Sequence, residues 1–276
     1  MDKTKTRGER MLLAVDVGNT TTRFGLFGDG AAVDAEPLGT WEVTTPACMT
    51  ADEARLAIAQ ALSQLPAGAA AMQHAILSCV VPSLESAWVQ ALATVSSERP
   101  LVVGPGLKTG IRLSYDDPSE IGSDRIADAA AARERYGAPA IVVDLGTTTN
   151  IEVVDASGAF AGGLIAPGLA LGARSLSDAA ARLPMVELRA PRHAIGKSTR
   201  EAMRAGVVLG EAARIDGLLD MVEAELAQGA DGDRPAIILT GDDAVAMAAI
   251  LRHQVTVDDT LTLRGLAALY RINSRK

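Results

Sequence analysis

The sequence predicts an α/β protein built from two similar halves, and three observations indicate this. Apolar segments typical of strands alternate with segments of helical spacing, which is the pattern of α/β architectures. A motif that begins at Leu12 recurs at Ala140. The chain has 276 residues, of which 48% are hydrophobic, enough for a sizeable core in one large or two ordinary domains.

The first half begins with two predicted strands joined by a tight turn. Residues 11–15 are apolar, and residues 21–27 provide a hairpin partner. The Gly-Asn pair between them suits a turn, because both residues tolerate positive φ. Further elements follow in order: a turn at 28–30, a helix over 51–65, a strand over 75–82 that Pro82 ends, a helix from Ser83, and a short strand over 101–104.

The second half repeats the opening motif of the first. Each copy has an apolar strand, an Asp-x-Gly turn, a run of threonines, a second strand, a small-residue turn and a third strand. Asp16 and Asp144 occupy the same place in the two copies. Two ordinary hairpins would explain the glycines. They would not explain why a carboxylate recurs at the same point, where burying its charge is costly unless it has a partner.

These turns have the chemistry of a phosphate site. Successive backbone N–H groups and hydroxyls in a glycine turn form a nest for anions, and a carboxylate there can hold a cation or its water shell. Residues 236–244 add a third related feature, a strand that ends in Thr-Gly at the start of a helix. The sequence therefore predicts a nucleotide clamp between two lobes.

Composition excludes several classes of function. The net charge is −8 and the pI is about 5.0, with no basic stripe, so nucleic acid is not expected as a partner. Two cysteines without a CxxC motif and three scattered histidines predict neither disulfides nor a zinc motif, and fit a reduced cytoplasmic setting. No apolar run approaches a membrane span, and residues 1–10 are expected to be a disordered tail.

The duplicated Asp-x-Gly-Asn/Thr-Thr hairpin, followed by a late glycine turn, resembles the acetate and sugar kinase/Hsp70/actin superfamily. Further motifs narrow the resemblance to the type III pantothenate kinase family over residues 11–270. In order they are "DVGNT" (16–20), "SCVVP" (78–82), "VGPGLKTG" (103–110), "DPSEIGSDRIADAAAA" (117–132), "VVDLGTTT" (142–149), "GGLIAPGL" (162–169) and "IGKST" (195–199).

This resemblance implies two actin-like (ribonuclease H-like) lobes, each a mixed sheet with flanking helices, with duplicated βββαβα units around a nucleotide cleft. We expect the first lobe over residues 11–117 and the second over 118–276, with the last helix able to pack back on the first. It also implies a homodimer. A helical stripe in the second lobe is expected to face the core, with a partner helix as the alternative: Ile215, Leu218, Leu219, Val222 and Leu226.

The resemblance further implies ATP-dependent phosphorylation of pantothenate to 4'-phosphopantothenate, the first step of coenzyme A biosynthesis. It assigns Asp124 as the catalytic base. From the residues alone, Ser123 as a helix cap and Asp124 as a partner of the helix dipole explain the same pattern. The residues implied to bind pantothenate are Tyr115, Gly122, Ser123, Asp124, Arg125 and Thr199.

ATP, Mg²⁺ and a monovalent cation, K⁺ or NH₄⁺, are the implied cofactors. By the same matching, Asp16 positions Mg²⁺ through water and Asp144 is the ligand of the monovalent cation. The residues implied to contact ATP are Asp16, Val17, Gly18, Asn19, Thr20, Thr21, Thr22, Arg23 and Thr147.

The chain departs from the family pattern at three positions. Asn150 and Glu152 stand where relatives typically carry threonine and aspartate, and Asp242 stands where they usually carry glycine. A carboxylate at 242 is expected to weaken nucleotide binding. Two alternatives therefore stay open: a nucleotide-binding regulatory paralogue with reduced activity, and another small-molecule kinase of the superfamily. The "GSDR" block at 122–125 argues against the second.

Two further patterns mimic nucleotide motifs. "PRHAIGKS" (191–198) resembles a Walker A loop, but proline replaces its first glycine. "GPGLKTG" (104–110) resembles a dinucleotide fingerprint, but threonine occupies its third glycine position. Both are predicted to be ordinary loops.

Overall fold

The computed structural model describes residues 11–28, 35–63, 72–180, 182–227 and 234–274. The expected tail over 1–10 and most of the turn expected at 28–30 lie outside these residues. The chain forms two compact units. Unit 1 comprises residues 1–110, 117–131 and 260–276, and unit 2 comprises residues 111–116 and 132–259.

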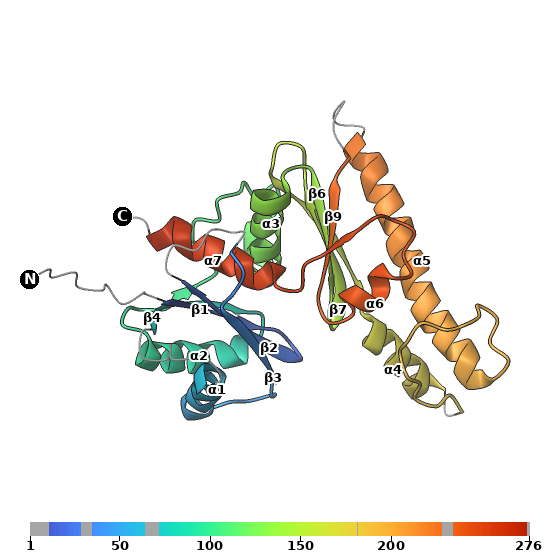
Figure 1. Cartoon of the computed structure of the whole chain (residues 1–276), viewed down its shortest axis with the longest axis horizontal. Coiled ribbons are helices and arrows are strands. Elements are labelled where there is room, and N and C mark those ends of the chain that lie inside the picture. The colour runs from blue at the N-terminus through green and yellow to red at the C-terminus, as the bar shows by residue number, and fades with distance from the viewer. Residues whose placement is uncertain (1–10, 29–34, 64–71, 181, 228–233, 275–276) are drawn as a thin grey trace, which may run out of the picture. The chain divides into compact units, whose positions relative to one another are not determined.

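Unit 1 contains a mixed five-stranded sheet in the order β3-β2-β1-β4-β5 (Figure 1). Its first three strands are antiparallel neighbours, and β4 and β5 join in parallel. The predicted hairpin is therefore present, with Gly18 and Asn19 between its strands. The bounds are β1 Met11–Val17, β2 Thr21–Gly28, β3 Gly39–Thr44, β4 Met72–Cys79 and β5 Leu101–Val102.

Helices cover both faces of this sheet. Alternate residues of β1, including Leu13 and Val15, pack with α1 (Ala51–Ser63) and α2 (Pro82–Val95) in one core. The other face contacts α7 (Leu261–Ser274). In Figure 1, α1 and α2 lie on one side of the strands and α7 on the other.

Unit 2 repeats this arrangement, with strand order β10-β9-β6-β7-β8. Its first three strands are again antiparallel neighbours, and β9 and β10 join in parallel. The motif repeated in the sequence therefore corresponds to the same strand arrangement in the two units. The bounds are β6 Ala140–Leu145, β7 Thr148–Val154, β8 Phe160–Pro167, β9 Ala236–Thr240 and β10 Thr256–Val257.

The core of unit 2 lies between this sheet and the helices α4 (Leu169–Ala179), α5 (Thr199–Ala227) and α6 (Ala244–Ala248). Ile215 and Leu219 on α5 are fully buried, and the other members of the predicted stripe pack around them. This stripe therefore faces the core of its own unit, as predicted.

The two units interleave along the chain. The helix α3 (Ser123–Tyr136) begins in unit 1, and α7 returns to unit 1 after unit 2 is complete. A side chain at Gly265 would collide with the Ala127 carbonyl, so α7 and α3 pack backbone to backbone. Residues 117–131 belong to unit 1 together with the first sheet, so the units are not separated by one boundary between residues 117 and 118.

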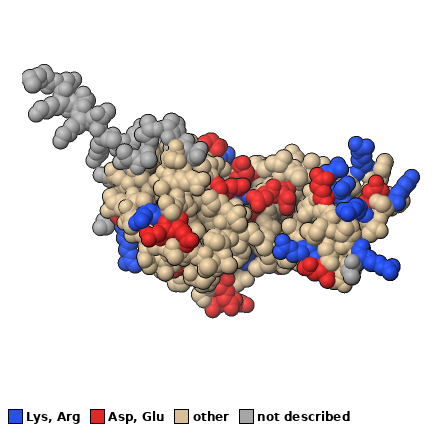
Figure 2. Space-filling view, turned by 90° about the horizontal axis from the view of Figure 1, so that it is seen from below, with Lys and Arg blue, Asp and Glu red and all other residues tan. Residues whose placement is uncertain are grey.

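Charged side chains of both signs lie close together on the surface. On the face drawn in Figure 2, Lys and Arg side chains are interspersed with Asp and Glu side chains. Among the described residues, no helix is both long and apolar enough to cross a membrane, and α5, the longest, carries charged residues along its length.

Candidate active site

Asp124 lies in the first turn of α3, just after a short 3₁₀ helix, η2 (Pro118–Glu120). Its Oδ1 atom accepts a hydrogen bond from the Arg125 backbone N–H at 2.7 Å. A Cβ at position 122 would collide with this oxygen, so the carboxyl group folds back over Gly122. Glycine at 122 therefore makes room for Asp124 at the helix start.

Ser123 joins this helix start to the sheet of unit 1. Its hydroxyl is 2.9 Å from the Ser78 hydroxyl and accepts the Cys79 backbone N–H at 3.2 Å. Ser78 lies beside Asp16, its register partner on β1. The structure thus brings the predicted base and the first aspartate turn to neighbouring positions of one unit. Ser78 was missed as a site residue, although it lies in the quoted "SCVVP" motif.

The environment of Asp124 changes its acidity. Burial raises the pKa of this carboxyl group, and the hydrogen bond from the Arg125 N–H and the Arg125 charge offset only part of the rise. A carboxylate with a raised pKa is a stronger proton acceptor, which suits a general base. Arg125 is 6% exposed, so its side chain is largely buried.

The first aspartate turn is closed by backbone hydrogen bonds. The Gly18 N–H donates to the Thr21 carbonyl at 3.0 Å, and the Thr45 N–H donates to the Thr20 carbonyl at 2.8 Å. Asn19 and Thr20 are exposed at the tip. This tip is the part of the predicted phosphate segment that is accessible to a ligand.

Two other members of that segment point into the protein. Val17 is fully buried in the core. The Thr22 hydroxyl is also buried and is 2.8 Å from the Thr45 hydroxyl. Arg23 lies 3.9 Å from Glu42 across the β2–β3 pair. Val17 and Thr22 can therefore serve a nucleotide through their backbone and by shaping the turn.

The second aspartate turn, after Asp144, packs against the start of α4. The Gly146 N–H donates to the Thr148 carbonyl at 3.0 Å, and the Gly168 N–H donates to the Thr147 carbonyl at 3.1 Å. A Cβ on Gly168 would collide with the Gly146 carbonyl and lie 2.6 Å from that of Thr147. Glycine at 168 therefore fixes the position of the turn that carries Thr147.

Replacing Gly168 with alanine should destabilise the protein by about 1–3 kcal/mol, the usual cost of overpacking. The backbone oxygens that the new methyl group meets cannot rotate away. Gly172 in the same helix is the matched control, because a Cβ added there would have no neighbouring atom within 4 Å. Alanine there should stabilise α4 by up to about 1 kcal/mol. Urea unfolding of both variants measures the difference; equal midpoints would contradict it.

Asp144 lies among oxygen atoms of two neighbouring strands. Its register partners are Asn150 on β7 and Thr240 on β9, so the three side chains share one face of the sheet. The Asn150 Oδ1 and Thr240 Oγ1 atoms are buried and have no hydrogen-bond partner among the described residues. Buried polar atoms without a partner are costly, which makes a bound cation a reasonable occupant.

A buried polar network supports the other face of this turn. The Thr149 hydroxyl donates to Glu211 at 2.6 Å, and Arg214 contacts Glu211 and donates to the Pro167 carbonyl at 2.6 Å. Glu211 is 6% exposed. The Glu211–Arg214 pair was missed by sequence reasoning, and its i,i+3 spacing on a helix was the available signal.

The third predicted feature is also present. β9 ends at Thr240, and Gly241 adopts φ +92° with its α-carbon against the Leu145 backbone. Burial raises the pKa of Asp243, two residues after Gly241, and the charges of Asp242 and Glu211 raise it further. The departure at 242 therefore adds negative charge near the end of β9.

Tyr115 and Thr199 both belong to unit 2. The Tyr115 ring lies 6.0 Å from the Phe160 ring, alongside β8. Thr199 is exposed in the first turn of α5, directly after Ser198, whose hydroxyl accepts the Glu201 N–H at 3.2 Å. Ser198 and Glu201 thus cap α5, and the hydroxyl of Thr199 is accessible.

Neither motif mimic has the structure of a nucleotide loop. Residues 191–198 follow a loop rather than a strand and lead into α5. Residues 104–110 form turns without opening a helix. Both predictions of ordinary loops are confirmed.

Comparison with known proteins decides the family. A family model described as type III pantothenate kinase matches residues 12–221. The chain belongs to the type III pantothenate kinase family. It is 38% identical over 264 residues to the type III pantothenate kinase of Syntrophus aciditrophicus, covering 96% of this chain and 100% of that protein. It is 37% identical over 263 residues to that of Listeria monocytogenes, covering 95% and 98%.

Solved structures agree on the fold. One from Campylobacter jejuni, provisionally assigned to the Baf family of transcriptional activators, has a TM-score of 0.57 at 19% identity, covering 95% of this chain and 98% of that one. MreB 5 of Spiroplasma citri has a TM-score of 0.50 at 12% identity, covering 95% and 96%. The fold class predicted from the sequence, two actin-like lobes with mixed sheets, is confirmed.

Proposed function

We propose that this type III pantothenate kinase family member transfers the γ-phosphoryl group of ATP to the primary hydroxyl of pantothenate, which forms 4'-phosphopantothenate and ADP. This is the first step of coenzyme A biosynthesis. The observation that carries the proposal is Asp124, a carboxylate of raised pKa at the start of α3, beside the strand pair that carries Asp16.

In the proposed reaction, Asp124 accepts the hydroxyl proton while the alkoxide oxygen forms a bond to the γ-phosphorus. The bond between that phosphorus and the bridging oxygen breaks, and ADP leaves with the electron pair. Ser123, bonded to Ser78 and to the Cys79 N–H, keeps the helix start in place. Arg125 beside Asp124 is proposed to bind the pantothenate carboxylate.

The phosphates of ATP are proposed to bind at the two aspartate turns. The exposed tip at Asn19 and Thr20 offers a hydroxyl and an amide, and Thr147 offers a second hydroxyl in unit 2. Mg²⁺, which neutralises phosphate charge, is proposed to be held by Asp16 through water, since Mg²⁺ prefers carboxylate and water oxygens. Thr199 and Tyr115 are proposed to line the pantothenate site.

A monovalent cation, K⁺ or NH₄⁺, is proposed to bind at Asp144. The support is the set of oxygens on this sheet face: the Asp144 carboxylate, the Asn150 Oδ1 atom and the Thr240 Oγ1 atom. Asn150, one of the departures from the family pattern, would contribute an oxygen to this set.

An ADP-release assay with a panel of acceptor alcohols tests the function. Pantothenate should give the fastest turnover, and acetate or hexoses should give little. Turnover with a hexose but not pantothenate would favour another kinase of the superfamily. Nucleotide binding without any turnover would favour the regulatory paralogue. Asp16, Asp124 and Asp144 are all retained, which favours activity.

We also propose that the protein is a cytoplasmic homodimer, as the family resemblance implies. Large apolar side chains are exposed on β8 and α4, namely Ile165, Leu171 and Leu176, and suit a subunit contact. Light scattering coupled to size exclusion should give twice the chain mass of 28.5 kDa at micromolar concentration. A mass of one chain under these conditions would contradict the dimer.

A further inference from the structure

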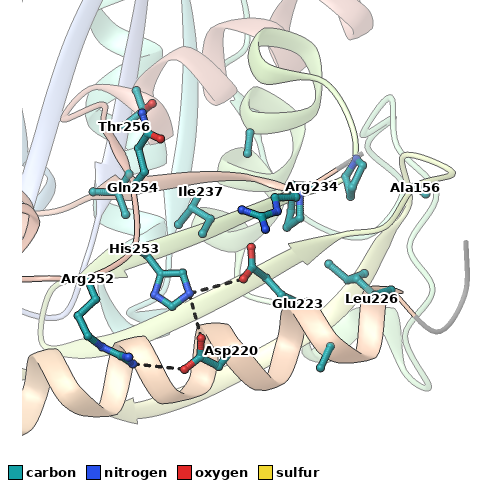
Figure 3. Close-up of a pocket in the computed structure, with 16 residues that line it drawn as sticks. Ala156, Asp220, Glu223, Leu226, Arg234, Ile237, Arg252, His253, Gln254 and Thr256 are labelled. Carbon is teal, nitrogen blue, oxygen red and sulfur yellow. Dashed lines mark hydrogen bonds and ion pairs between the residues drawn. The ribbon is translucent and has the colours of Figure 1, made fainter. Parts of the chain in front are cut away.

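A second cluster of ionisable side chains lies in unit 2, beside a pocket of about 890 Å³. Asp220 and Glu223 project from the last part of α5, and His253 projects toward them from the segment between α6 and β10 (Figure 3). Their ligand atoms all lie within 4.8 Å of one another. None of these residues belongs to the site proposed for ATP or pantothenate.

The distances within the cluster suit a metal ion. His253 Nε2 is 3.3 Å from Asp220 Oδ1 and 3.5 Å from Glu223 Oε2. A tetrahedral ion with bonds of 2.0–2.1 Å has its ligand atoms about 3.3 Å apart. The imidazole nitrogen is therefore already at ligand spacing from both carboxylates, and a small rotation of the exposed Asp220 side chain would complete the set.

Asp216, one helical turn before Asp220, orients the imidazole. It is 3% exposed, and its Oδ1 atom is 2.8 Å from His253 Nδ1. Its oxygens also accept hydrogen bonds from the backbone N–H groups of Arg252 and His253, at 3.1 and 3.2 Å, and from the Arg252 Nε–H at 3.2 Å. A carboxylate held by these donors accepts the Nδ1–H of His253, which leaves Nε2 facing Asp220 and Glu223.

Arg252 holds the carboxylates of Asp216 and Asp220 through hydrogen bonds. Its backbone N–H lies 3.1 Å from both Asp216 oxygens, and its guanidinium lies 3.3 Å from Asp220 Oδ2. Asp220 Oδ1 is left directed toward His253. A neutral imidazole would direct its Nε2 lone pair at two negatively charged carboxylates, which repel it. A cation between these groups, or a proton on Nε2, would offset this repulsion.

We propose that His253, Asp220 and Glu223 bind one transition-metal dication of the Zn²⁺ class. A carboxylate that holds the far nitrogen of a ligating histidine is the usual support of such sites, and Asp216 supplies it. One nitrogen and two oxygens give three protein ligands, which leaves a position for water. The metal would link α5 to the segment before β10 and so brace this edge of unit 2.

The site is separate from the proposed cation position at Asp144. The pocket is lined by Pro139 and Ala236, next to and at the starts of β6 and β9. Asp144 lies near the other end of β6, four residues or roughly 13 Å along the strand from Ala140. An oxygen-only site also prefers Mg²⁺ or K⁺, whereas an imidazole ligand favours Zn²⁺.

Metal binding to the full chain tests the proposal. Titration with Zn²⁺ in excess Mg²⁺ and without nucleotide should give one tight site per chain, because Mg²⁺ occupies sites made of oxygen alone. Co²⁺ in place of Zn²⁺ should give the visible absorption of a low-coordinate centre. Zn²⁺ should also raise the melting temperature, since it binds the folded state.

Two variants locate the site. The double variant Asp220→Asn/Glu223→Gln keeps side-chain size and should lose Zn²⁺ binding and the thermal shift. Asp216→Asn should weaken binding by about 10–100-fold, as expected for the partner of a ligating histidine. His193→Gln, which alters an exposed histidine elsewhere in unit 2, is the control and should bind as the parent does.

Either of two results would overturn the proposal. Parent protein that takes up no Zn²⁺ in this titration would mean that His253 is simply an imidazolium ion paired with the carboxylates. Equal uptake by the parent and the double variant would place the metal elsewhere. Both readouts are independent of phosphoryl transfer, so neither depends on the proposed kinase activity.

Discussion

Asp124→Asn is expected to lower kcat for pantothenate phosphorylation by about 10²–10⁴, the usual contribution of a positioned general base. The asparagine Oδ1 atom can still accept the Arg125 N–H, so the helix start should be preserved. ATP binding should also survive, because the proposed phosphate contacts lie in the two aspartate turns. Steady-state kinetics and nucleotide titration measure both effects.

The stability of this variant distinguishes catalysis from a helix-dipole role. Because burial raises the folded-state pKa of Asp124, the folded protein holds that proton more tightly than the unfolded chain. The contribution of Asp124 to the free energy of unfolding therefore falls as the pH rises from the ordinary aspartate pKa through the folded-state pKa. At neutral pH the amide removes this cost, so Asp124→Asn should melt at the parent temperature or above it. A helix-dipole role predicts a loss of about 0.3–1 kcal/mol with near-normal turnover.

The pH profile of the parent gives a second test. Only the ionised carboxylate can accept the hydroxyl proton, and burial favours the protonated form. The acidic limb of kcat/KM should therefore lie above the ordinary aspartate pKa of about 3.9. Asp117→Asn is the matched control, since it makes the same change in an exposed aspartate that caps η2. If Asp124→Asn turns over within a few-fold of this control, Asp124 is structural.

Replacing K⁺ with tetramethylammonium, a cation too bulky to enter the proposed site, at constant ionic strength is expected to reduce kcat/KM for ATP by about tenfold or more. In the proposed complex, the Asp144 carboxylate and the triphosphate would repel each other, by about 4 kcal/mol for each unit pair at 4 Å and an effective dielectric of 20. Relief of even about 1.4 kcal/mol of this repulsion corresponds to a tenfold change in rate. Initial rates in KCl, NH₄Cl, NaCl and tetramethylammonium chloride measure the effect.

Thr240→Val tests whether the neighbouring oxygens take part. Valine has nearly the shape of threonine but lacks the buried hydroxyl that has no partner among the described residues. The variant should need more K⁺ for half-maximal activity, while kcat at saturating K⁺ stays close to that of the parent. Equal rates in all four salts, for parent and variant alike, would contradict the proposal that Asp144 binds a monovalent cation.

Much of the architecture could be predicted because its signals are local. Strand periodicity, the Gly-Asn turn and the recurrence of Asp16 at Asp144 are each contained in a short stretch. The α5 core stripe was likewise readable from helical spacing, with Ile215 and Leu219 fully buried as expected. Such patterns are set by backbone geometry and burial of one face, which a sequence displays directly.

The polar contacts that support the site were not predictable in this way. Ser78 meets Ser123, and Thr149 meets Glu211, across separations of 45 and 62 residues. No local pattern records which strand end a helix will meet. Asn150 was noted only as a departure from the family pattern, because its strand partner, Asp144, becomes its neighbour only when β6 and β7 pair. The interleaving of the units was not predictable for the same reason. Whether α3 and α7 lie against the first or the second sheet depends on tertiary packing, which no local pattern records.

The position of α7 has a consequence for synthesis on the ribosome. Residues 260–276 belong to unit 1, and α7 supplies many buried side chains, including Leu261, Leu266 and Leu269. Unit 1 therefore cannot close until these residues leave the exit tunnel, whereas residues 132–259 of unit 2 have already emerged. The sheet made first is completed last, and the nascent chain holds an uncovered apolar face of β1 while unit 2 folds.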